Sequence, residues 1–415
     1  MTDTANVPAI RFKGFTDAWA QRKLGALTEK FDYGLNAAAK EYDGKNKYLR
    51  ITDIDDASHE FVKDYLTSPA IDSSLIDKYR LQSNDVLFAR TGASVGKTYR
   101  YKDSDGLVYF AGFLIRARIK PIHDVDFVFY STLSSRYFLF IQMISQRSGQ
   151  PGVNAIEYSG YDIYAPTKEE QIHIGTLFRR LDHLITLHKR KCDLFKNIKK
   201  SLLEKMFPKN GSVIPEVRFK GFTDAWEQRK LGEVAVFRRG LTYKLTDISN
   251  KGIRVLRSSN IEEDRFMLQD EDTYVDLSAI NIEYAKDNDI LITAANGSSR
   301  LVGKHALIRG IADDSTVHGG FMLLASSEVP GFLNALMSTN WYATFIGTYT
   351  TGGNGALGNL KKTDLEEQIV LIADREENSR VGSIPFTFDN LITLHQRKVE
   401  KLQNIKKALL EKMFV

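Results

Sequence analysis

Two long stretches of the chain carry apolar residues at helical spacing. Residues 168–207 contain neither Gly nor Pro after Gly175 until Pro208, and apolar positions recur there every three or four residues. This spacing predicts one helix of roughly 60 Å, at 1.5 Å per residue, that stops at the Pro-Lys-Asn-Gly sequence. Its apolar stripe consists of Leu181, Leu184, His188, Cys192, Phe195, Ile198, Leu202 and Met206.

A second stripe of the same kind lies near the C-terminal end. A lone amphipathic helix would leave its apolar seam in water, so the two stripes predict helices that pair as an antiparallel coiled coil. Pro385 stands where the first copy has Phe178, and the second helix is therefore expected to start or kink near residues 387–389. The second stripe consists of Leu391, His395, Val399, Leu402, Ile405, Leu409 and Met413.

The helices are part of a repeat that covers the chain. RFKGFTDAWAQRKLG at 11–25 returns as RFKGFTDAWEQRKLG at 218–232, an offset of 207 residues. The helical sequence at 181–207 returns at 388–414 with 18 of 27 positions identical, again offset by 207 (388 minus 181). Between these anchors the two halves diverge almost completely. The pattern predicts a shared frame that carries two interchangeable inserts in a pseudo-two-fold repeat.

The sequence RTGASVGKT at 90–98 is close to a phosphate-binding loop but does not fit one. Only three residues separate Gly92 from Gly96, and the alternating residues that follow predict a strand where such a loop needs a helix. The counterpart in the second half, ANGSSRLVGKH, has five residues between its glycines. One nucleotide site could not tolerate both spacings. We interpret both as loops between strands, with Lys97 and Lys304 facing solvent or a polyanion.

The most apolar stretch, residues 127–144, carries Arg136 and four Ser or Thr hydroxyls near its middle, which predicts a buried helix and no membrane span. The N-terminal sequence MTDTANVPAI has no signal-peptide pattern. Cys192 is the single cysteine, which excludes an intrachain disulfide and a Cys-based zinc site and fits a reducing compartment. These features predict a cytoplasmic protein.

The sequence carries none of the common catalytic motifs. The chain has no Pro-Pro pair for methyl transfer to a base amine, no G-x-S-x-G sequence, and no His spacing for a metal. A length of 415 residues suits two or three domains, and 43% hydrophobic residues can build cores for them. The net charge of +5 permits a polyanionic partner without requiring one. We expect a recognition or scaffold subunit without enzymatic activity.

The duplicated RFKGFTDAW-x-QRKLG opening, the divergent inserts and the duplicated LITLH-x-RK…NIKK-x-LLEKMF helix together resemble the specificity subunit of bacterial type I restriction-modification systems. The likeness covers the whole chain in order. It implies an α+β fold in which two globular α/β target recognition domains, each reading half of a split DNA site, are separated by the two paired helices. The implied domains are residues 1–165 (first recognition domain with its frame motif), 166–207 (first spacer helix), 208–217 (linker), 218–372 (second recognition domain) and 373–415 (second spacer helix).

The resemblance also implies partners. They are double-stranded DNA, two methylation subunits that dock on the helices, and restriction subunits in the full complex, with no membrane. This chain would hold no cofactor, because S-adenosylmethionine, ATP and magnesium would belong to the partner subunits. A rival hypothesis from the repeat alone is a scaffold that grips two copies of a protein partner without touching nucleic acid.

Candidate DNA-reading residues are polar or basic side chains on glycine-punctuated loops, because base edges and phosphates are recognised by such groups. In the first insert they are Tyr33, Asn36, Arg90, Thr91, Ser94, Lys97, Arg147, Gln150 and Asn154. In the second insert they are Arg238, Arg239, Tyr243, Ser298, Arg300, Lys304, Asn354 and Asn359.

Overall fold

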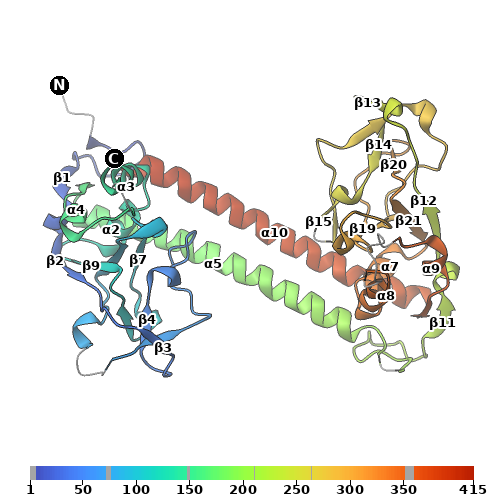
Figure 1. Cartoon of the computed structure of the whole chain (residues 1–415), viewed down its shortest axis with the longest axis horizontal. Helices are drawn as coiled ribbons and strands as arrows, with labels where there is room; N and C mark the ends of the chain where they lie inside the picture. The colour runs from blue at the N-terminus through green and yellow to red at the C-terminus, as the bar shows by residue number, and fades with distance from the viewer. Residues whose placement is uncertain (1–5, 72–75, 147–149, 210, 263, 351–358) are drawn as a thin grey trace. The chain divides into compact units, whose positions relative to one another are not determined.

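The computed structural model describes residues 6–71, 76–146, 150–209, 211–262, 264–350 and 359–415. The chain divides into two compact units, and Figure 1 labels many of their elements. Unit 1 comprises residues 1–189 and 397–415, and unit 2 comprises residues 190–396. Two long helices, α5 (Lys168–Lys205) and α10 (Arg375–Met413), contribute residues to both units.

Unit 1 is built on a four-stranded antiparallel sheet in the order β2-β9-β6-β7. Its strand β6 (Asp85–Ala89) is buried along its whole length. Val86 and Phe88 belong to one hydrophobic cluster, whereas Leu87 and Ala89 belong to another. Successive side chains of a strand point to opposite faces, so both faces of this strand are covered. That coverage explains why the sequence at this strand is a continuous apolar run.

The remaining strands of unit 1 form smaller pairs. β4 pairs with β8 in parallel, whereas β1 pairs with β10 and β3 with β5 in antiparallel fashion. The bounds are β1 (Ala20–Lys23), α1 (Leu24–Leu27), β2 (Thr28–Tyr33), β3 (Ala39–Glu41), β4 (Lys47–Leu49), β5 (Thr67–Pro69), β7 (Thr98–Arg100), β8 (Val108–Phe110), β9 (Leu114–Ile119), α2 (Val125–Ser131), α3 (Ser135–Ser145), α4 (Ala155–Ser159) and β10 (Asp162–Ala165).

Unit 2 has the same strand order in its own four-stranded antiparallel sheet, β12-β21-β18-β19, and β14 pairs with β20 in parallel as β4 does with β8. The inserts diverge in sequence, so the spacing of apolar residues and turns, not residue identity, sets this pairing. The bounds are β11 (Glu227–Lys230), α6 (Leu231–Val234), β12 (Ala235–Arg239), β13 (Ile248–Ser249), β14 (Ile253–Leu256), β15 (Ile261–Glu262), β16 (Arg265–Phe266), β17 (Thr273–Val275), β18 (Ile290–Thr293), β19 (His305–Leu307), β20 (Thr316–His318), β21 (Met322–Ser327), α7 (Pro330–Met337), α8 (Asn340–Thr350), α9 (Lys362–Glu366) and β22 (Ile369–Ile372).

The duplicated RFKGF motif supplies a buried ion pair to the start of each long helix. In unit 1, Arg11 binds both carboxylate oxygens of Glu170 at 2.6 and 2.8 Å, and Glu170 is fully buried. In unit 2, Arg218 binds Glu377 in the same way at 2.7 and 2.8 Å, and the indole N–H of Trp226 donates a third hydrogen bond at 3.2 Å. The duplicated motif therefore fixes the start of each long helix to its own unit through a buried ion pair.

The predicted first helix is confirmed, with bounds of Lys168–Lys205. The second helix does not start near residues 387–389, because α10 begins at Arg375 and continues through Pro385 to Met413, within the predicted spacer range of 373–415. A proline inside a helix removes one backbone hydrogen bond and costs about 3 kcal/mol. Here Val381 and Pro385 are buried, and Gly382 lies against the backbone of α7. This packing holds the turn helical despite the proline.

Each unit contains contacts between its segments of the two long helices. In unit 1, Lys406 of α10 donates to Asp182 of α5 at 2.6 Å. In unit 2, Lys199 binds Asp389 at 2.8 Å, and the buried Cys192 thiol lies 3.7 Å from the carbonyl oxygen of Ile392. Within each unit the two helix segments are therefore joined by at least one ion pair.

The predicted stripe is wrong at two positions. Leu184 and Ile405 are 40% and 38% exposed, whereas Ile185 and Ile392 are 8% and 2% exposed. Ile174, Phe178 and Leu181 of α5 belong to the same hydrophobic cluster as α2. Because α5 faces the core of unit 1 as well as α10, its buried face differs from the one that an isolated helix pair would use.

The apolar stretch at 127–144 forms two helices, α2 and α3, where one was predicted. The first helix ends at Ser131 with Thr132 as its C-cap. Ser134 caps the second, since its side chain accepts a hydrogen bond from the N–H of Tyr137. Hydroxyl side chains of this kind favour caps over helix interiors. Within the described residues, no helix is both long and apolar enough to cross a membrane.

Candidate functional site

Four loops of unit 1 are held together by backbone hydrogen bonds, and we call residues 33–36, 90–92, 111–113 and 150–154 the first loop cluster. The N–H of Arg90 donates to the carbonyl of Phe113 at 3.0 Å, and the carbonyl of Arg90 accepts from Val153 at 2.9 Å. A Cβ on Gly34 would lie 2.0 Å from the carbonyl oxygen of Ala111. Only glycine, which has no Cβ, permits this approach. The loops at 33–36 and 111–113 therefore meet through residues that lie far apart in the sequence.

Side chains of the first loop cluster form a partly organised polar surface. The guanidinium of Arg90 lies 5.0 Å from the centre of the Tyr33 ring, and the Tyr33 hydroxyl accepts a hydrogen bond from the N–H of Ala155 at 3.2 Å. A cation held over a ring in this way is favourable by about 0.5–1 kcal/mol at an exposed site. The contact positions the Arg90 guanidinium at the surface of the first loop cluster. Gln150 is exposed beside Gly92 of the same cluster.

The structure brings most of the first-insert candidates together. Tyr33, Asn36, Arg90, Thr91, Gln150 and Asn154 all lie on the first loop cluster. The side chain of Asn154 caps α4 by accepting from the N–H of Glu157 at 3.0 Å, so its oxygen is already engaged. Arg147 lies outside the described residues.

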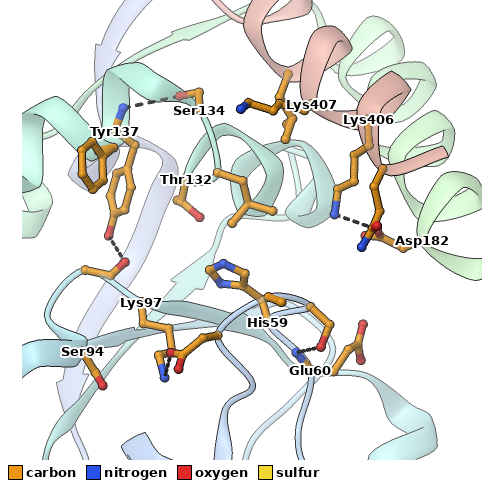
Figure 2. A pocket seen from close by; sticks show the side chains of 18 of the residues that line it. His59, Glu60, Ser94, Lys97, Thr132, Ser134, Tyr137, Asp182, Lys406 and Lys407 are labelled. Carbon is orange, nitrogen blue, oxygen red and sulfur yellow. Dashed lines mark hydrogen bonds and ion pairs between the residues drawn. The ribbon is translucent and has the colours of Figure 1, made fainter. Parts of the chain in front are cut away.

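Ser94 and Lys97 line a different feature, a cavity of about 560 Å³ in unit 1 (Figure 2). The prediction that Lys97 faces solvent or a polyanion is wrong. Its side chain is 11% exposed, donates to the carbonyl of Ile54 at 3.0 Å and forms an ion pair with Asp56. These contacts remove Lys97 from the candidate DNA-reading residues. The predicted strand after the loop is confirmed as β7, so no helix follows to bind phosphate.

The last glycine in each of the two sequences that are similar to a phosphate-binding loop, Gly96 and Gly303, is required by the backbone conformation. Gly96 and Gly303 have φ of +86° and +82°. A Cβ would lie 2.7 Å from Ile141 of α3 in one unit and 2.6 Å from Ile346 of α8 in the other. Both loops therefore use glycine to turn against a helix, which agrees with our interpretation of the two sequences as loops between strands. No group of three His, Cys, Asp or Glu residues in the described ranges could hold a metal ion.

Unit 2 has a corresponding set of loops, residues 240–243, 257–259, 294–297, 319–321 and 359, which we call the second loop cluster. The carbonyl of Phe321 accepts hydrogen bonds from the N–H groups of Ala294 and Ala295 at 2.9 and 3.1 Å, where the carbonyl of Phe113 in unit 1 accepts one from Arg90. A Cβ on Gly240 would lie 1.9 Å from the carbonyl oxygen of Gly319, matching the approach at Gly34. The loops enclose a cavity of about 820 Å³.

Only some of the candidate residues of the second insert lie on the second loop cluster. Tyr243 lines the cavity of the second loop cluster, and Asn359 bridges to Ala295. Arg238 is 17% exposed and binds Asp289 at 2.6 Å and Glu283 at 3.0 Å, so we remove it from the candidates. Exposed candidates next to the cluster in sequence are Arg239, Ser298 and Arg300; Lys304 is half-buried, and Asn354 lies outside the described residues.

Sequence reasoning missed two aromatic residues and several polar ones. Phe113 and Phe321 are 63% and 74% exposed and stand at the same turn in the two units. The available signal was a Gly-Phe pair that recurs at 112–113 and 320–321, an offset of 208 (320 minus 112). Polar lining residues that the prediction omitted are Arg257, Ser258, Ser259, Thr242 and Asn296.

His318 supports the turn of the second loop cluster, and we predict that it makes unit 2 sensitive to acid. Its ring is 1% exposed, and Nε2 lies 3.2 Å from the carbonyl oxygen of Arg238. Burial lowers the pKa of His318 to about 4 from 6.5. The unfolded chain therefore takes up a proton first as the pH falls. The contribution of neutral His318 to the free energy of unfolding is expected to be fully present above pH 6.5. It should fall by up to about 3 kcal/mol as the pH declines toward 4.

The measurement is the thermal midpoint of unit 2 at pH 7.5 and pH 4.5 for the natural chain and His318→Gln. The variant is expected to lose less stability between the two pH values. An equal loss in both proteins would show that other groups carry the acid sensitivity.

Comparison with known proteins gives matches along most of the chain. Residues 17–197 match the model of the type I restriction modification DNA specificity domain. The type I restriction enzyme MjaVIII specificity subunit of Methanocaldococcus jannaschii is 21% identical over 390 residues, which cover 89% of this chain and 85% of that protein.

Two solved structures have a similar fold. The S subunit of a type I restriction-modification system from M. genitalium matches with a TM-score of 0.63 at 13% identity, over 99% of both chains. A structure described as the structural basis underlying complex assembly and conformational transition of the type I R-M system matches with a TM-score of 0.50 at 14% identity, over 94% of this chain and 96% of that one. Likeness at these identities concerns the fold.

Proposed function

Because this chain belongs to the family of type I restriction-modification specificity subunits, we propose that it reads a split DNA target with one half-site per unit. Specificity subunits are the non-catalytic members of these systems, and catalysis lies in partner subunits. Each loop cluster would contact one half-site, with cationic groups on phosphates and polar side chains on base edges.

The observation that carries the proposal is the pair of loop clusters. Both are built by corresponding backbone contacts on the same strand order, but most of the polar side chains that they present differ. Arg90 and Gln150 belong to the first cluster, whereas Tyr243 and Asn296 belong to the second. A shared scaffold with divergent contact groups is what reading two unrelated half-sites requires.

The long helices would provide the spacing and the docking surface. We propose that α5 and α10 pair as an antiparallel coiled coil, which the contacts between their segments within each unit support. The coil would set the distance between half-sites in a pseudo-two-fold arrangement and bind two methylation subunits, with restriction subunits joining the full complex. Those partners would bring S-adenosylmethionine, ATP and magnesium.

The test is an exchange of residues 26–165 for the corresponding insert of a relative. The hybrid would be co-expressed with the cognate methylation subunit in a methylation-free host, and methylated bases would be mapped across the genome. One half of the split motif is expected to change while the other half and the gap remain. A change in both halves would contradict modular reading.

Methylation mapping, together with the salt dependence of DNA binding, distinguishes a DNA-reading subunit from a protein scaffold. A split motif that disappears when this chain is omitted supports DNA reading. If no motif appears although the methylation subunit is bound, and DNA binding lacks a steep linear dependence on the logarithm of salt concentration, the scaffold hypothesis is favoured.

A further inference from the structure

A solvent-exposed phenylalanine occupies the same turn in both units. Residues 111–114 form a β-turn closed by a hydrogen bond of 2.9 Å from the N–H of Leu114 to the carbonyl of Ala111, and residues 319–322 form the matching turn with a bond of 2.8 Å. Phe113 and Phe321 are the third residues of these turns, 63% and 74% exposed. Two divergent inserts thus present the same side chain at the same place.

The backbone of each turn is fixed while its ring remains free of the core. The Phe113 carbonyl accepts from Arg90, and the Phe321 carbonyl accepts from Ala294 and Ala295. A Cβ on the preceding Gly112 would lie 3.4 Å from the carbonyl oxygen of Leu35, so the turn also packs on the loop that follows β2. Each ring is therefore held next to the loops that carry the candidate reading residues.

Folding does not account for these rings. Burial of a phenylalanine side chain stabilises the folded state by about 1.5–3 kcal/mol. Phe113 and Phe321 contribute little of this because their rings are largely exposed. Among the described residues, neither ring belongs to a buried hydrophobic cluster. The Gly-Phe pair nevertheless recurs where the surrounding sequence has diverged. A shared function at the surface explains both the exposure of the rings and the recurrence of the Gly-Phe pair.

The surroundings of the rings favour DNA over a protein partner. Arg90 and Tyr33 lie on the first loop cluster with Phe113, and Arg257, Asn296 and Phe321 line one cavity in the second. A surface with cationic and amide groups around one apolar side chain is complementary to a DNA duplex. In the duplex, phosphates and polar base edges surround the apolar methyl groups of thymine. The core of a protein interface is instead depleted of charged residues.

We propose that Phe113 and Phe321 are specificity-determining residues that each press a phenyl ring against a thymine methyl group in their own half-site. This inference rests on the proposed function, since it assumes that each unit reads one half-site. It adds an apolar contact to the polar reading groups and assigns that contact to one residue per unit.

The experiment uses the complete complex of this chain with its methylation subunit. Phe113→Ala and Phe321→Ala would be compared with the natural chain for binding to the target duplex over a range of salt concentrations. Affinity is expected to fall roughly tenfold, within the range for loss of one specific base contact. The slope of log affinity against log salt should not change, because no phosphate contact is removed. Phe138→Ala is a matched control on α3, where Phe138 is 61% exposed, and should bind normally.

A second measurement locates the contact. Replacing the thymines of one half-site by deoxyuridine removes only their methyl groups. The natural complex is expected to lose affinity for that duplex, whereas Phe113→Ala should lose none on one modified half-site and Phe321→Ala none on the other. Equal losses in natural and variant complexes would overturn the inference.

Other outcomes are distinguishable. Normal DNA binding with weakened assembly would assign the rings to a protein partner and overturn the proposal. Normal binding by both phenylalanine variants, with a split motif still methylated, would overturn this inference while the proposed function stands. The absence of any split motif with the natural chain would overturn the proposed function and this inference with it.

Discussion

Replacing Arg218 with alanine is expected to destabilise unit 2 by about 3–5 kcal/mol. Glu377 is fully buried and receives two hydrogen bonds from Arg218. Removing the arginine leaves a carboxylate in the interior whose one remaining side-chain partner among the described residues is the Trp226 N–H. Breaking a buried pair in this way costs about that amount. The measurement is unfolding by denaturant, followed with a probe in unit 2.

Two further variants test the cause. Lys220→Ala changes an exposed residue of the same motif and should alter stability little. Arg218→Ala combined with Glu377→Gln removes the charge that needs compensation and should recover part of the loss. If the double variant is no more stable than the single one, lost packing and not the unpaired charge explains the effect. Arg11→Ala should act on unit 1 as Arg218→Ala acts on unit 2, because Arg11 binds Glu170 in the same way.

Because we propose that α5 and α10 set the distance between the half-sites, inserting one heptad into each helix is expected to lengthen the gap between half-sites by about three base pairs. Seven helical residues add roughly 10 Å, and consecutive base pairs are about 3.4 Å apart. The insertions are placed between Lys189 and Arg190 and between Gln396 and Arg397, where the chain passes from one unit to the other, so contacts within each unit are kept. Mapping of methylated bases measures the gap.

An insertion in α5 alone is the control. It should abolish methylation, because in the proposed coiled coil the stripe of one helix would shift against that of the other. An unchanged gap in the double insertion, with methylation retained, would refute the role of the helices as a spacer.

The amino-acid sequence by itself determined the features that depend on local spacing. The 3.6-residue period predicted α5 within two residues of its end, and the offset of 207 separated the frame from the inserts. The alternation after Lys97 identified β7 and excluded a phosphate-binding loop. These inferences hold because helix period, strand alternation and glycine spacing are properties of short segments.

Tertiary structure decided whatever depends on pairing between distant residues. The loop clusters form because β9 pairs with β2 and β6, and because glycines such as Gly34 allow backbone contact across more than seventy residues. The same packing places Lys97 against Ile54, and lets α10 continue through Pro385. Burial, which depends on all neighbours at once, also left Phe113 and Phe321 in solvent. No local pattern specifies such exposure, so only the folded chain shows which apolar residues are left to contact a partner.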